Sequence, residues 1–302
     1  MNNHLFKAFK RSKALVLASA VVLSLYGTAC AQQPVESTTP SAPATVQTLA
    51  KAELKQVIVS TEEEFFQAID SNVCIVLKPG VYNLSNWANK RLKTIVADEE
   101  HVKVIKQNGA SVATWSQQGD SGFINLNGIN NMTIKAQNSA LPTQIVIEDP
   151  HENVMNFYNC QNITLEGLIF GHTVKPGCSG NVLHFGECSD VTLNNLNLYG
   201  CGAYAIEASK TNNMNVNRCW IHDCTYGMLT MYGCQNVNFK DSFLTCCKEW
   251  TLLDCTGCTV NFEGCYFKYN KGNTFLRSKE GITFKNCTFG EYEKEALAEP
   301  AK

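Results

Sequence analysis

The fold is decided by the stretch NVNRCWIHDCTYGMLTMYGCQNVNFKDSFLTCC, residues 215–247, which holds five cysteines. Short runs of alternating apolar and polar residues, such as Val237-Asn238-Phe239, recur in it, and this two-residue period is typical of β-strands. A cysteine-dense stretch of this kind is compatible with three structures: a metal cluster, a disulfide framework or a packed core. The positions of the cysteines relative to the strands distinguish these alternatives.

Apolar-polar-apolar triplets repeat through the second half of the chain. They begin at Met132, Ile163, Val191, Met214, Val237, Val260 and Ile282, and successive starts are 31, 28, 23, 23, 23 and 22 residues apart. An apolar residue lies about eight positions before each of the first six triplets, at Ile124, Met155, Leu183, Ile206, Leu229 and Leu252. A short fixed period indicates a solenoid, and the alternation indicates strands. Three strands per turn predict an all-β, right-handed parallel β-helix, because parallel crossovers are right-handed.

The predicted domain covers residues 51–292, and residues 293–302 form a C-terminal tail. Near its start, STEEEFFQAI places Glu64 three residues after Thr61, which is the capping-box pattern of a helix N-terminus. We expect this short helix to lay its two phenylalanines over the first coil, because an open sheet edge invites pairing with other chains.

The next segment, CIVLKPGVYNL (residues 74–84), predicts a strand, a Pro-Gly turn and a second strand. With this segment and the repeats, the chain resembles the pectate-lyase-like superfamily of secreted right-handed β-helix proteins over residues 56–290. The resemblance implies this fold. It implies no single activity, because the superfamily contains lyases, hydrolases, epimerases and non-enzymes.

The cysteines fall at three repeating positions. Cys219, Cys265 and Cys287 lie five residues after their triplets, Cys201, Cys224 and Cys247 lie ten after, and Cys160, Cys188 and Cys234 lie three before. Such ladders favour small inward-facing core positions, where free cysteine acts as a small hydrophobe. Neighbouring members such as Cys201 and Cys224 are also close enough for disulfides, and Cys178 in an extra loop is a candidate clamp. The isolated Cys255-x-x-Cys258 pair has no matching second pair, so we predict no metal and no cofactor.

The first 30 residues have the pattern of a signal peptide. A basic segment precedes an apolar run at residues 14–27 that is too short for a comfortable membrane span. Two cleavage patterns stay open: a lipobox ending at Cys30, which would be lipidated, and an A-x-A site ending at Ala31. Residues 31–50 are rich in Ser, Thr and Pro and predict a flexible tether. We expect export to the periplasm or cell envelope, as an outer-membrane lipoprotein or as a secreted form.

The charge distribution argues against a nucleic-acid partner. The whole chain has 25 basic and 27 acidic residues, and the leader carries four of the basic ones and no acid. What remains is acidic, without a basic face of interleaved aromatic residues. The predicted partner is a polysaccharide, and contact with a membrane is expected only through an N-terminal lipid anchor.

Titratable residues fall on two rows of the repeat. His184 and Glu207 share the position seven before the triplet, in adjacent coils, and His172, His222 and Asp223 lie eight or nine after it. Because the chain turns between these rows, we expect the five side chains to gather along one corner, where they would form an acid/base site. His184 and Glu207 are the candidates for proton transfer, and the others would orient or stabilise. The same pattern also fits polar decoration of a solvated sheet face.

Two further features concern carbohydrate. Trp220, Phe243 and Tyr266 occupy one outward row, which fits either a platform for sugar rings or a surface covered by another segment. Residues 149–152, Asp-Pro-His-Glu, are similar to the D-P-H-[DE] core of mannuronan C5-epimerases, but the Tyr-Gly-x that precedes that core is missing. The sequence therefore leaves two functions open: an enzyme that cleaves or epimerises polysaccharide, and a non-catalytic envelope scaffold or glycan-binding protein.

Overall fold

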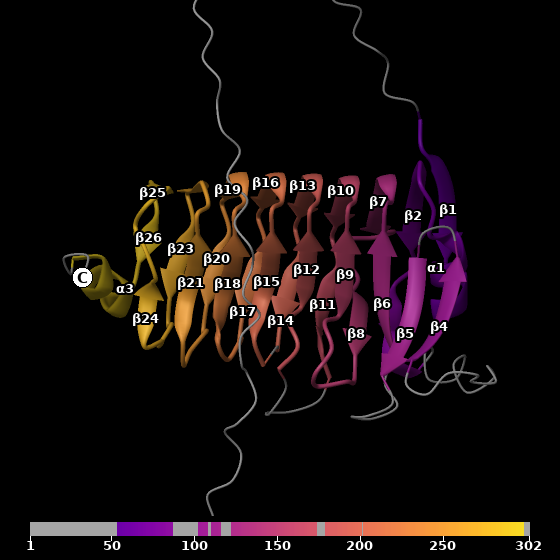
Figure 1. The fold of residues 1–302 in the computed structure, drawn as a ribbon, viewed down its shortest axis with the longest axis horizontal. Coiled ribbons are helices and arrows are strands. Elements are labelled where there is room, and N and C mark those ends of the chain that lie inside the picture. The colour runs from indigo at the N-terminus through magenta and orange to yellow at the C-terminus, as the bar shows by residue number, and fades with distance from the viewer. Residues whose placement is uncertain are drawn as a thin grey trace, which may run out of the picture. The chain divides into compact units, whose positions relative to one another are not determined.

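In a computed structural model, the chain is described for residues 53–86, 102–107, 110–115, 122–173, 179–200 and 202–298. Residues Lys51–Lys302 form one compact unit. Figure 1 shows its coils stacked side by side from the N-terminal strands in indigo to the C-terminal helix in yellow. Among the described residues, no helix has the length and apolar character needed to cross a lipid bilayer.

From β7 to β24, successive coils contribute one strand to each of three sheets, which we call A, B and C. Sheet A contains the triplets. In spatial order it consists of β1 (Lys55–Val59), β2 (Val73–Leu77), β7 (Asn130–Ala136), β10 (Gln161–Glu166), β13 (Ser189–Asn194), β16 (Asn212–Asn217), β19 (Gln235–Lys240), β22 (Val260–Glu263) and β25 (Ile282–Lys285).

Sheets B and C complete each coil. Sheet B consists of β3 (Gly80–Asn83), β8 (Thr143–Ile147), β11 (Ile169–His172), β14 (Asn197–Tyr199), β17 (Trp220–His222), β20 (Phe243–Thr245), β23 (Tyr266–Lys268) and β26 (Thr288–Phe289). Sheet C consists of β4 (Val102–Gln107), β5 (Ala110–Trp115), β6 (Gly122–Asn127), β9 (Met155–Tyr158), β12 (Leu183–Gly186), β15 (Tyr204–Ser209), β18 (Gly227–Tyr232), β21 (Thr251–Thr256) and β24 (Thr274–Leu276). The predicted parallel β-helix is therefore confirmed. The antiparallel pairing of β4 with β5 and of β5 with β6 was not predicted.

The register follows the sequence repeat closely. Val191 pairs with Met214, and Val237 pairs with Val260, so the triplets lie directly beside one another in sheet A. One position departs from the prediction: Leu229 pairs with Leu253, not Leu252. The turn before β21 holds one more residue than its predecessor, and its residue Glu249 has a positive φ of 86°.

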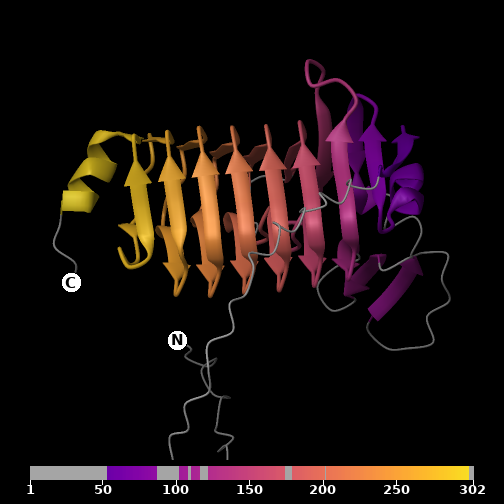
Figure 2. The same ribbon diagram turned by 90° about the horizontal axis from the view of Figure 1, so that it is seen from above.

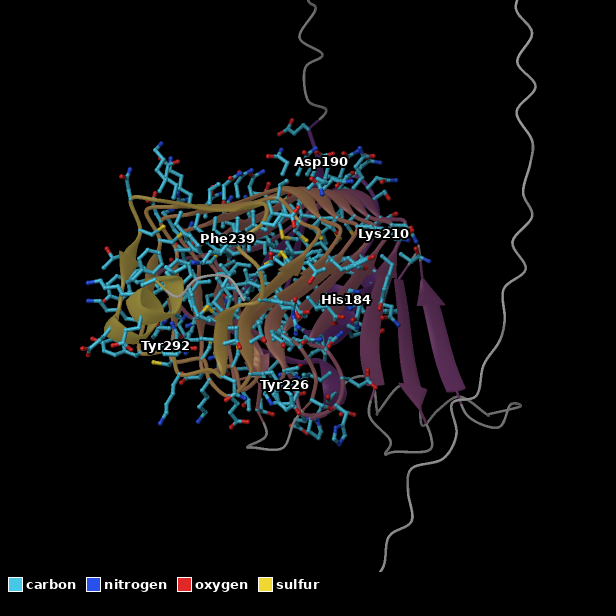
Figure 3. The ribbon with its side chains drawn as sticks, turned by 60° about the vertical axis from the view of Figure 1, so that its left-hand side comes forward. His184, Asp190, Lys210, Tyr226, Phe239 and Tyr292 are labelled. Atoms are coloured by element: carbon cyan, nitrogen blue, oxygen red, sulfur yellow. The ribbon has the colours of Figure 1, made fainter. Side chains whose placement is uncertain are left out.

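The interior is a continuous stack of apolar side chains. In Figure 3, Phe239 lies among the side chains that fill the coils. Its ring stacks on that of Phe262 in the next coil, with 4.9 Å between centroids, an arrangement that adds to the gain from burying both rings. The ladder cysteines Cys160, Cys188 and Cys234 are at most 1% exposed, which confirms their inward positions.

Three buried polar side chains at the corners of the coils each connect their own coil to the preceding one. Thr211 Oγ1 accepts a hydrogen bond from the backbone N–H of Cys188 (3.3 Å) and donates to Phe185 O (3.1 Å). Equivalent bonds occur at the other two corners. Ser242 Oγ accepts from Cys219 N and donates to Val216 O. Asn270 Oδ1 accepts from Cys247 N, and its Nδ2 donates to Leu244 O. We call Thr211, Ser242 and Asn270 the corner pegs. They satisfy backbone groups that the turns would otherwise leave buried without a partner.

The corner pegs explain why cysteine recurs at these sites. Cys219 Sγ donates to Leu193 O at 3.5 Å, as Ser242 Oγ does to Val216 O at 3.4 Å. We therefore predict that Ser242→Cys lowers the free energy of unfolding by about 1 kcal/mol or less, whereas Ser242→Ala lowers it by about 1–3 kcal/mol. Denaturant unfolding of the two variants checks this. Equal losses would mean that the sulfur does not substitute for the hydroxyl.

Helices lie at both ends. The expected N-terminal helix is α1 (Glu62–Ala68), in which Thr61 Oγ1 accepts a hydrogen bond from Glu64 N and Phe65 and Phe66 are buried. Residues 293–298, which the sequence assigned to a C-terminal tail, instead belong to helix α3 (Glu291–Ala298), which contacts strands β23, β24 and β26. Figure 2 shows α3 at the opposite end of the stack from β1 and α1.

Candidate functional site

The outward face of sheet C carries a row of polar residues that includes His184 and Glu207. Pairing between strands β9, β12, β15, β18 and β21 aligns Asn156, His184, Glu207, Thr230 and Asp254 in successive coils. These side chains point away from the core because residues alternate between the two faces of a strand. His184 is labelled in Figure 3.

His184 and Glu207 are in contact, as the sequence predicted. His184 Nδ1 lies 3.2 Å from Glu207 Oε2, and the two side chains are 16% and 36% exposed. A carboxylate beside one ring nitrogen fixes the orientation and tautomer of an imidazole, which leaves the other nitrogen to exchange a proton with a substrate. The pair is thus accessible and suited to acid/base chemistry.

Asn181 holds Glu207 in place. Its Nδ2 donates to Glu207 Oε2 (2.5 Å), and its Oδ1 accepts from Tyr204 N (2.9 Å). The backbone N–H of Asn181 donates to Asn153 Oδ1 (2.7 Å), and Asn153 Nδ2 donates to Asn156 Oδ1 (2.7 Å). This amide chain fixes the carboxylate against the backbone of three coils. Sequence reasoning missed it because Asn181 lies at the end of the extra loop, outside the repeat.

Tyr158 packs against the imidazole. The two ring centroids are 5.0 Å apart, and the phenol ring lies over Gly186, where a Cβ would come within 2.8 Å of it. His184 Nε2 is on the same side, 3.4 Å from that Cβ position. Burial raises the pKa of the Tyr158 phenol, and the negative charges of Glu207 and Glu152 raise it further. Tyr158 is therefore a neutral hydroxyl beside the His184–Glu207 pair.

Glu152 is a second carboxyl group near Tyr158. Burial raises the pKa of Glu152, the charge of Asp149 adds to the effect, and His151 acts against it. The segment is held by His151, whose backbone N–H donates to Asp149 Oδ1 (2.6 Å) and whose ring Nδ1 is 2.9 Å from Ser179 Oγ. A carboxyl group with a raised pKa retains its proton more readily, which suits a general acid.

Beyond Glu207 the row ends in Asp254. The spacing of seven residues before the triplet at Val260 predicts Leu253 at this position, but the extra residue before β21 shifts the register by one, and Leu253 is buried. Asp254 Oδ2 is 2.7 Å from Arg277 Nε. Three aromatic residues, Tyr204, Tyr226 and Trp250, lie beside this ion pair at successive corners. The ring centroids of Tyr204 and Tyr226 are 6.5 Å apart, and those of Tyr226 and Trp250 are 5.5 Å apart.

His222 and Asp223 lie elsewhere, at the end of β17 in sheet B. His222 Nδ1 is 2.6 Å from Asp223 Oδ2, and its Nε2 is 2.8 Å from Asn197 Oδ1. The imidazole stacks on Trp220, with 3.9 Å between centroids. Within the described residues, no hydrogen bond or ion pair joins this pair to His184 or Glu207. The structure thus brings together two separate pairs, and both ring nitrogens of His222 are occupied.

His172 is buried in β11, 4% exposed. Its Nε2 lies 2.9 Å from Glu152 O, so this nitrogen is the N–H donor, and its Nδ1 has no hydrogen-bond partner among the residues that the structure describes. Burial lowers the pKa of His172, and the contact with Glu152 O offsets part of the effect. Rather than reaching a substrate directly, His172 supports the Glu152 backbone from inside.

We predict that His172 makes the fold sensitive to acid. Its pKa is lowered in the folded state, so below about pH 6.5, the ordinary value, the unfolded chain binds a proton that the folded chain does not. Stability is therefore retained above pH 6.5 and falls as the pH drops toward the folded pKa, by at most about 1.4 kcal/mol per pH unit. Urea unfolding between pH 7.5 and 5 measures this. His172→Gln, which keeps a donor for Glu152 O, should flatten the slope, and an unchanged slope would exclude His172 as its source.

The aromatic row predicted for sheet B is present. Trp220 and Phe243 are directly paired and 47% and 51% exposed, and Phe243 pairs with Tyr266, over whose ring Lys268 Nζ lies at 4.8 Å. Trp220 Nε1 donates to Thr245 Oγ1 (3.0 Å), which fixes the indole. The C-terminal helix contacts β23 at the far end of this row and leaves Trp220 and Phe243 exposed.

Several predicted positions lie outside the described residues: the lipidation candidate Cys30, the clamp candidate Cys178, and Cys201. Their pairing and modification stay predictions. Among the cysteines that the structure describes, none forms a disulfide with another. Within the same residues, no group of three or more His, Cys, Asp or Glu side chains is arranged to hold a metal ion.

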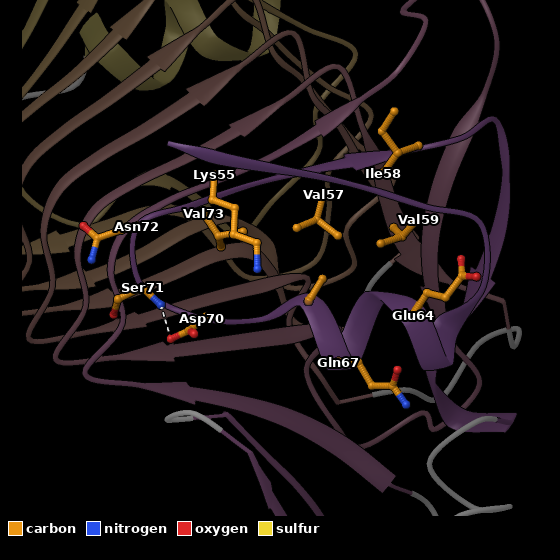
Figure 4. A pocket seen from close by; sticks show the side chains of 11 residues that line it. Lys55, Val57, Ile58, Val59, Glu64, Gln67, Asp70, Ser71, Asn72 and Val73 are labelled. Atoms are coloured by element: carbon orange, nitrogen blue, oxygen red, sulfur yellow. Dashed lines mark hydrogen bonds between the residues drawn. The ribbon is translucent and has the colours of Figure 1, made fainter. Parts of the chain in front are cut away.

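A hollow of about 430 Å³ lies at the N-terminal end, between β1 and α1. Figure 4 shows Lys55 and Val57 of β1 on one side and Glu64 and Gln67 of α1 on the other. It contains none of the predicted site residues, so it is separate from the sheet C face.

Comparisons with known proteins agree with this architecture. Residues 123–289 match the family described as the right handed beta helix region. A comparison with curated protein sequences gives no match.

Similar solved structures include a pectin methylesterase in complex with a hexasaccharide (9% identity, 71% of this chain and 61% of that one, TM-score 0.43). A pectate lyase (13%, 72% and 55%, TM-score 0.39) and an alginate lyase from Paenibacillus (8%, 78% and 99%, TM-score 0.34) are also similar. At these identities and TM-scores the similarities say nothing about what this chain acts on. The three stacked parallel sheets and the match over residues 123–289 show that the chain belongs to the right-handed β-helix family.

Proposed function

We propose that this chain is an exported enzyme that acts on carbohydrate, with His184 and Glu207 transferring protons. The observation that carries the proposal is the 3.2 Å contact between His184 Nδ1 and Glu207 Oε2, in a pair that stays accessible on sheet C. Glu207 is itself held by Asn181. General acid/base catalysis needs such an oriented imidazole within reach of substrate.

The surroundings of the pair suit a sugar polymer. Tyr204, Tyr226 and Trp250 lie at successive corners of the coils beside it, and Trp250 is 56% exposed. Aromatic faces offer sugar rings a large apolar contact, and the nearby Thr230 and Asp254 offer hydrogen bonds. We place the main substrate path along these residues.

The test is to incubate the purified chain with a panel of polyuronates and envelope glycans. New reducing ends and new unsaturated uronate absorbance are followed together, beside a His184→Ala/Glu207→Ala double variant. Activity that the double variant loses supports the proposal. Activity that survives in the double variant would show that the protein is an enzyme but that His184 and Glu207 are not its catalytic residues.

A second candidate function is a non-catalytic glycan-binding protein of the envelope. The observation in its favour is the exposed row Trp220 and Phe243 on sheet B, where His222 stacks on Trp220 and Thr245 fixes the indole. Binding of soluble glycans that the double variant retains and Trp220→Ala loses, without any turnover, would select this function.

The proposed location is the cell envelope, with Cys30 as a lipid anchor and residues 31–50 as a tether. The supporting features are the basic and apolar leader and the Gly27-Thr28-Ala29-Cys30 sequence. Membrane fractionation tests this: Cys30→Ala should move the protein from the membrane fraction to the soluble fraction. An unchanged distribution would favour cleavage after Ala31.

A further inference from the structure

Cysteines of successive coils lie against one another at the corners of the stack. Where sheet C turns into sheet A, Ser189 N donates to Cys160 O (3.0 Å), and this register places Cys160 and Cys188 side by side in adjacent coils. At the same corner, Cys234 N donates to Cys258 Sγ (3.2 Å). The two thiols of each pair are in hydrogen-bonding contact. Each sulfur therefore already lies next to a sulfur with which it can form a bond.

The backbone spacing at these corners suits a disulfide. Neighbouring strands of a parallel sheet are about 4.8 Å apart, and a disulfide joins residues whose Cα atoms are roughly 4.4–6.8 Å apart. A cysteine two coils away is about 9.6 Å distant, which is beyond that range. At any one corner, pairing is thus restricted to cysteines of adjacent coils.

Thr211 separates the two pairs at this corner. Its Oγ1 accepts from Cys188 N (3.3 Å), as Cys258 Sγ accepts from Cys234 N, so the threonine occupies the place of a cysteine in the ladder. Cys188 and Cys234 lie on either side of it, two coils apart. A hydroxyl group cannot form a disulfide, and Thr211 therefore leaves Cys160 with Cys188 and Cys234 with Cys258.

Ser242 has the same position where sheet A turns into sheet B. Its Oγ accepts from Cys219 N (3.1 Å), and beyond it Cys265 contacts Cys287 of the next coil. In the coil before Cys219 lies Leu196, whose carbonyl accepts from the residue after Cys219 (2.8 Å). Within the described residues, no other cysteine lies beside Cys219 at this corner, which makes it a natural reference for an unpaired thiol.

The third corner, where sheet B turns into sheet C, follows the same rule. Cys224 contacts Cys247 of the next coil, and Lys248 N donates to Cys224 O (3.1 Å). Asn270 comes next in this ladder and accepts from Cys247 N (2.9 Å). At each corner a polar side chain thus takes the place of a cysteine.

We infer that, in an oxidising compartment, the chain forms four disulfides between adjacent coils, and that the corner pegs keep the pairs apart. One thiolate of a pair attacks a disulfide oxidant such as oxidised glutathione and releases one glutathione thiolate. The partner thiolate then attacks the mixed disulfide and releases the second, so that two electrons pass from the cysteines to the oxidant. Because most of these sulfurs are buried, the exchange takes place while the coils are folding. The four pairs are Cys160–Cys188, Cys224–Cys247, Cys234–Cys258 and Cys265–Cys287.

The inference does not depend on the proposed catalytic site, and a map of the linkages tests it. The full chain is unfolded and reduced in urea, then refolded with a mixture of reduced and oxidised glutathione or, in parallel, with dithiothreitol. Free thiols are alkylated, and the protein is digested without reduction for mass spectrometry. We expect the four linked peptide pairs only in the glutathione sample, and alkylated Cys219 in both. Unlinked peptides throughout, or other linkages such as Cys201–Cys224 in their place, would overturn the inference.

Two variants distinguish a disulfide from simple packing. Cys188→Ala removes one pair, and Cys219→Ala removes an unpaired thiol from a site that is equally buried, at 1% exposed. In the oxidised protein, Cys188→Ala should lower the melting temperature by about 6 °C or more beyond its effect in the reduced protein. Cys219→Ala should have the same effect in both states. An equal effect of Cys188→Ala in both states would mean that Cys160 and Cys188 only pack together.

Thr211→Cys tests the separating role of the peg. The introduced thiol lies one coil from both Cys188 and Cys234, so refolding with glutathione should give new linkages to these two cysteines beside the original pairs. An unchanged linkage map would show that the threonine does not keep the pairs apart. For the same reason, the packing comparison between Ser242→Cys and Ser242→Ala applies to the reduced chain, in which the introduced thiol cannot bridge a neighbouring cysteine.

Discussion

Replacing Glu207 with glutamine is expected to lower kcat on the glycan substrate by about 10²- to 10⁴-fold. The carboxylate holds the imidazole of His184 through the 3.2 Å contact with Nδ1, and a neutral amide neither fixes the tautomer nor stabilises the imidazolium. Glutamine keeps the size of the side chain and an oxygen that accepts from Asn181 Nδ2. The loss should therefore appear in kcat, with KM and the melting temperature nearly unchanged.

Two controls define what this result means. Glu187→Gln, on the surface beside Lys210, should leave kcat as it is. Combining Glu207→Gln with His184→Gln should cost little more than either single change, because residues that act as a unit are not additive. A full kcat in Glu207→Gln would remove the pair from the mechanism.

The second large effect concerns the corner peg at the C-terminal end. We expect Asn270→Leu to lower the free energy of unfolding by about 3–5 kcal/mol. Asn270 is 5% exposed, accepts from Cys247 N (2.9 Å), and donates to Leu244 O (2.9 Å) and to Glu293 Oε1 of α3 (2.8 Å). Leucine leaves three buried groups unpaired, among them a carboxyl group that is 1% exposed. Denaturant unfolding measures the loss.

The double variant Asn270→Leu/Glu293→Leu should recover part of that stability, because replacing both buried partners by apolar groups removes the unpaired carboxyl. Asn261→Leu is the matched control on the exposed amide ladder of sheet A, where Asn261 bonds Asn238 and Thr283. We expect it to cost about 1 kcal/mol or less. Equal losses at both positions would mean that burial of Asn270 does not matter.

Much of the fold was predictable because the core repeats with a fixed period. Once Val237 and Val260 are aligned, the pairing of sheet A follows, and so do the inward cysteines. What escaped prediction breaks the period. The extra residue before β21 moves Leu253 inward and Asp254 outward, and nothing in an apolar pattern alone distinguishes Leu252 from Leu253. Helix α3 was missed because its few apolar residues, such as Tyr292 and Leu297, are spread among glutamates.

The site was predictable only where it follows the strands. His184 and Glu207 share a row, so their contact follows from register alone. Tyr158 lies two residues after Asn156, the residue that pairs with His184. Its ring reaches His184 only because Gly186, in the neighbouring coil, has no side chain in the way. Asn181 and Glu152 lie in turns, whose paths the repeat does not determine. The expected grouping with His222 relied on such a turn, and the structure pairs His222 with Asp223 and Asn197 instead.

The corner pegs also give assembly of the molecule a direction. Thr211, Ser242 and Asn270 each bond backbone groups of the coil before their own, and none of these bonds requires a coil that comes later in the chain. When the chain emerges N-terminus first, from the ribosome or through a membrane pore, the coils that contain these residues can therefore form these hydrogen bonds with a preceding coil that has already folded. The hydrogen bond between Asn270 and Glu293 of α3 forms last, because α3 is near the C-terminus.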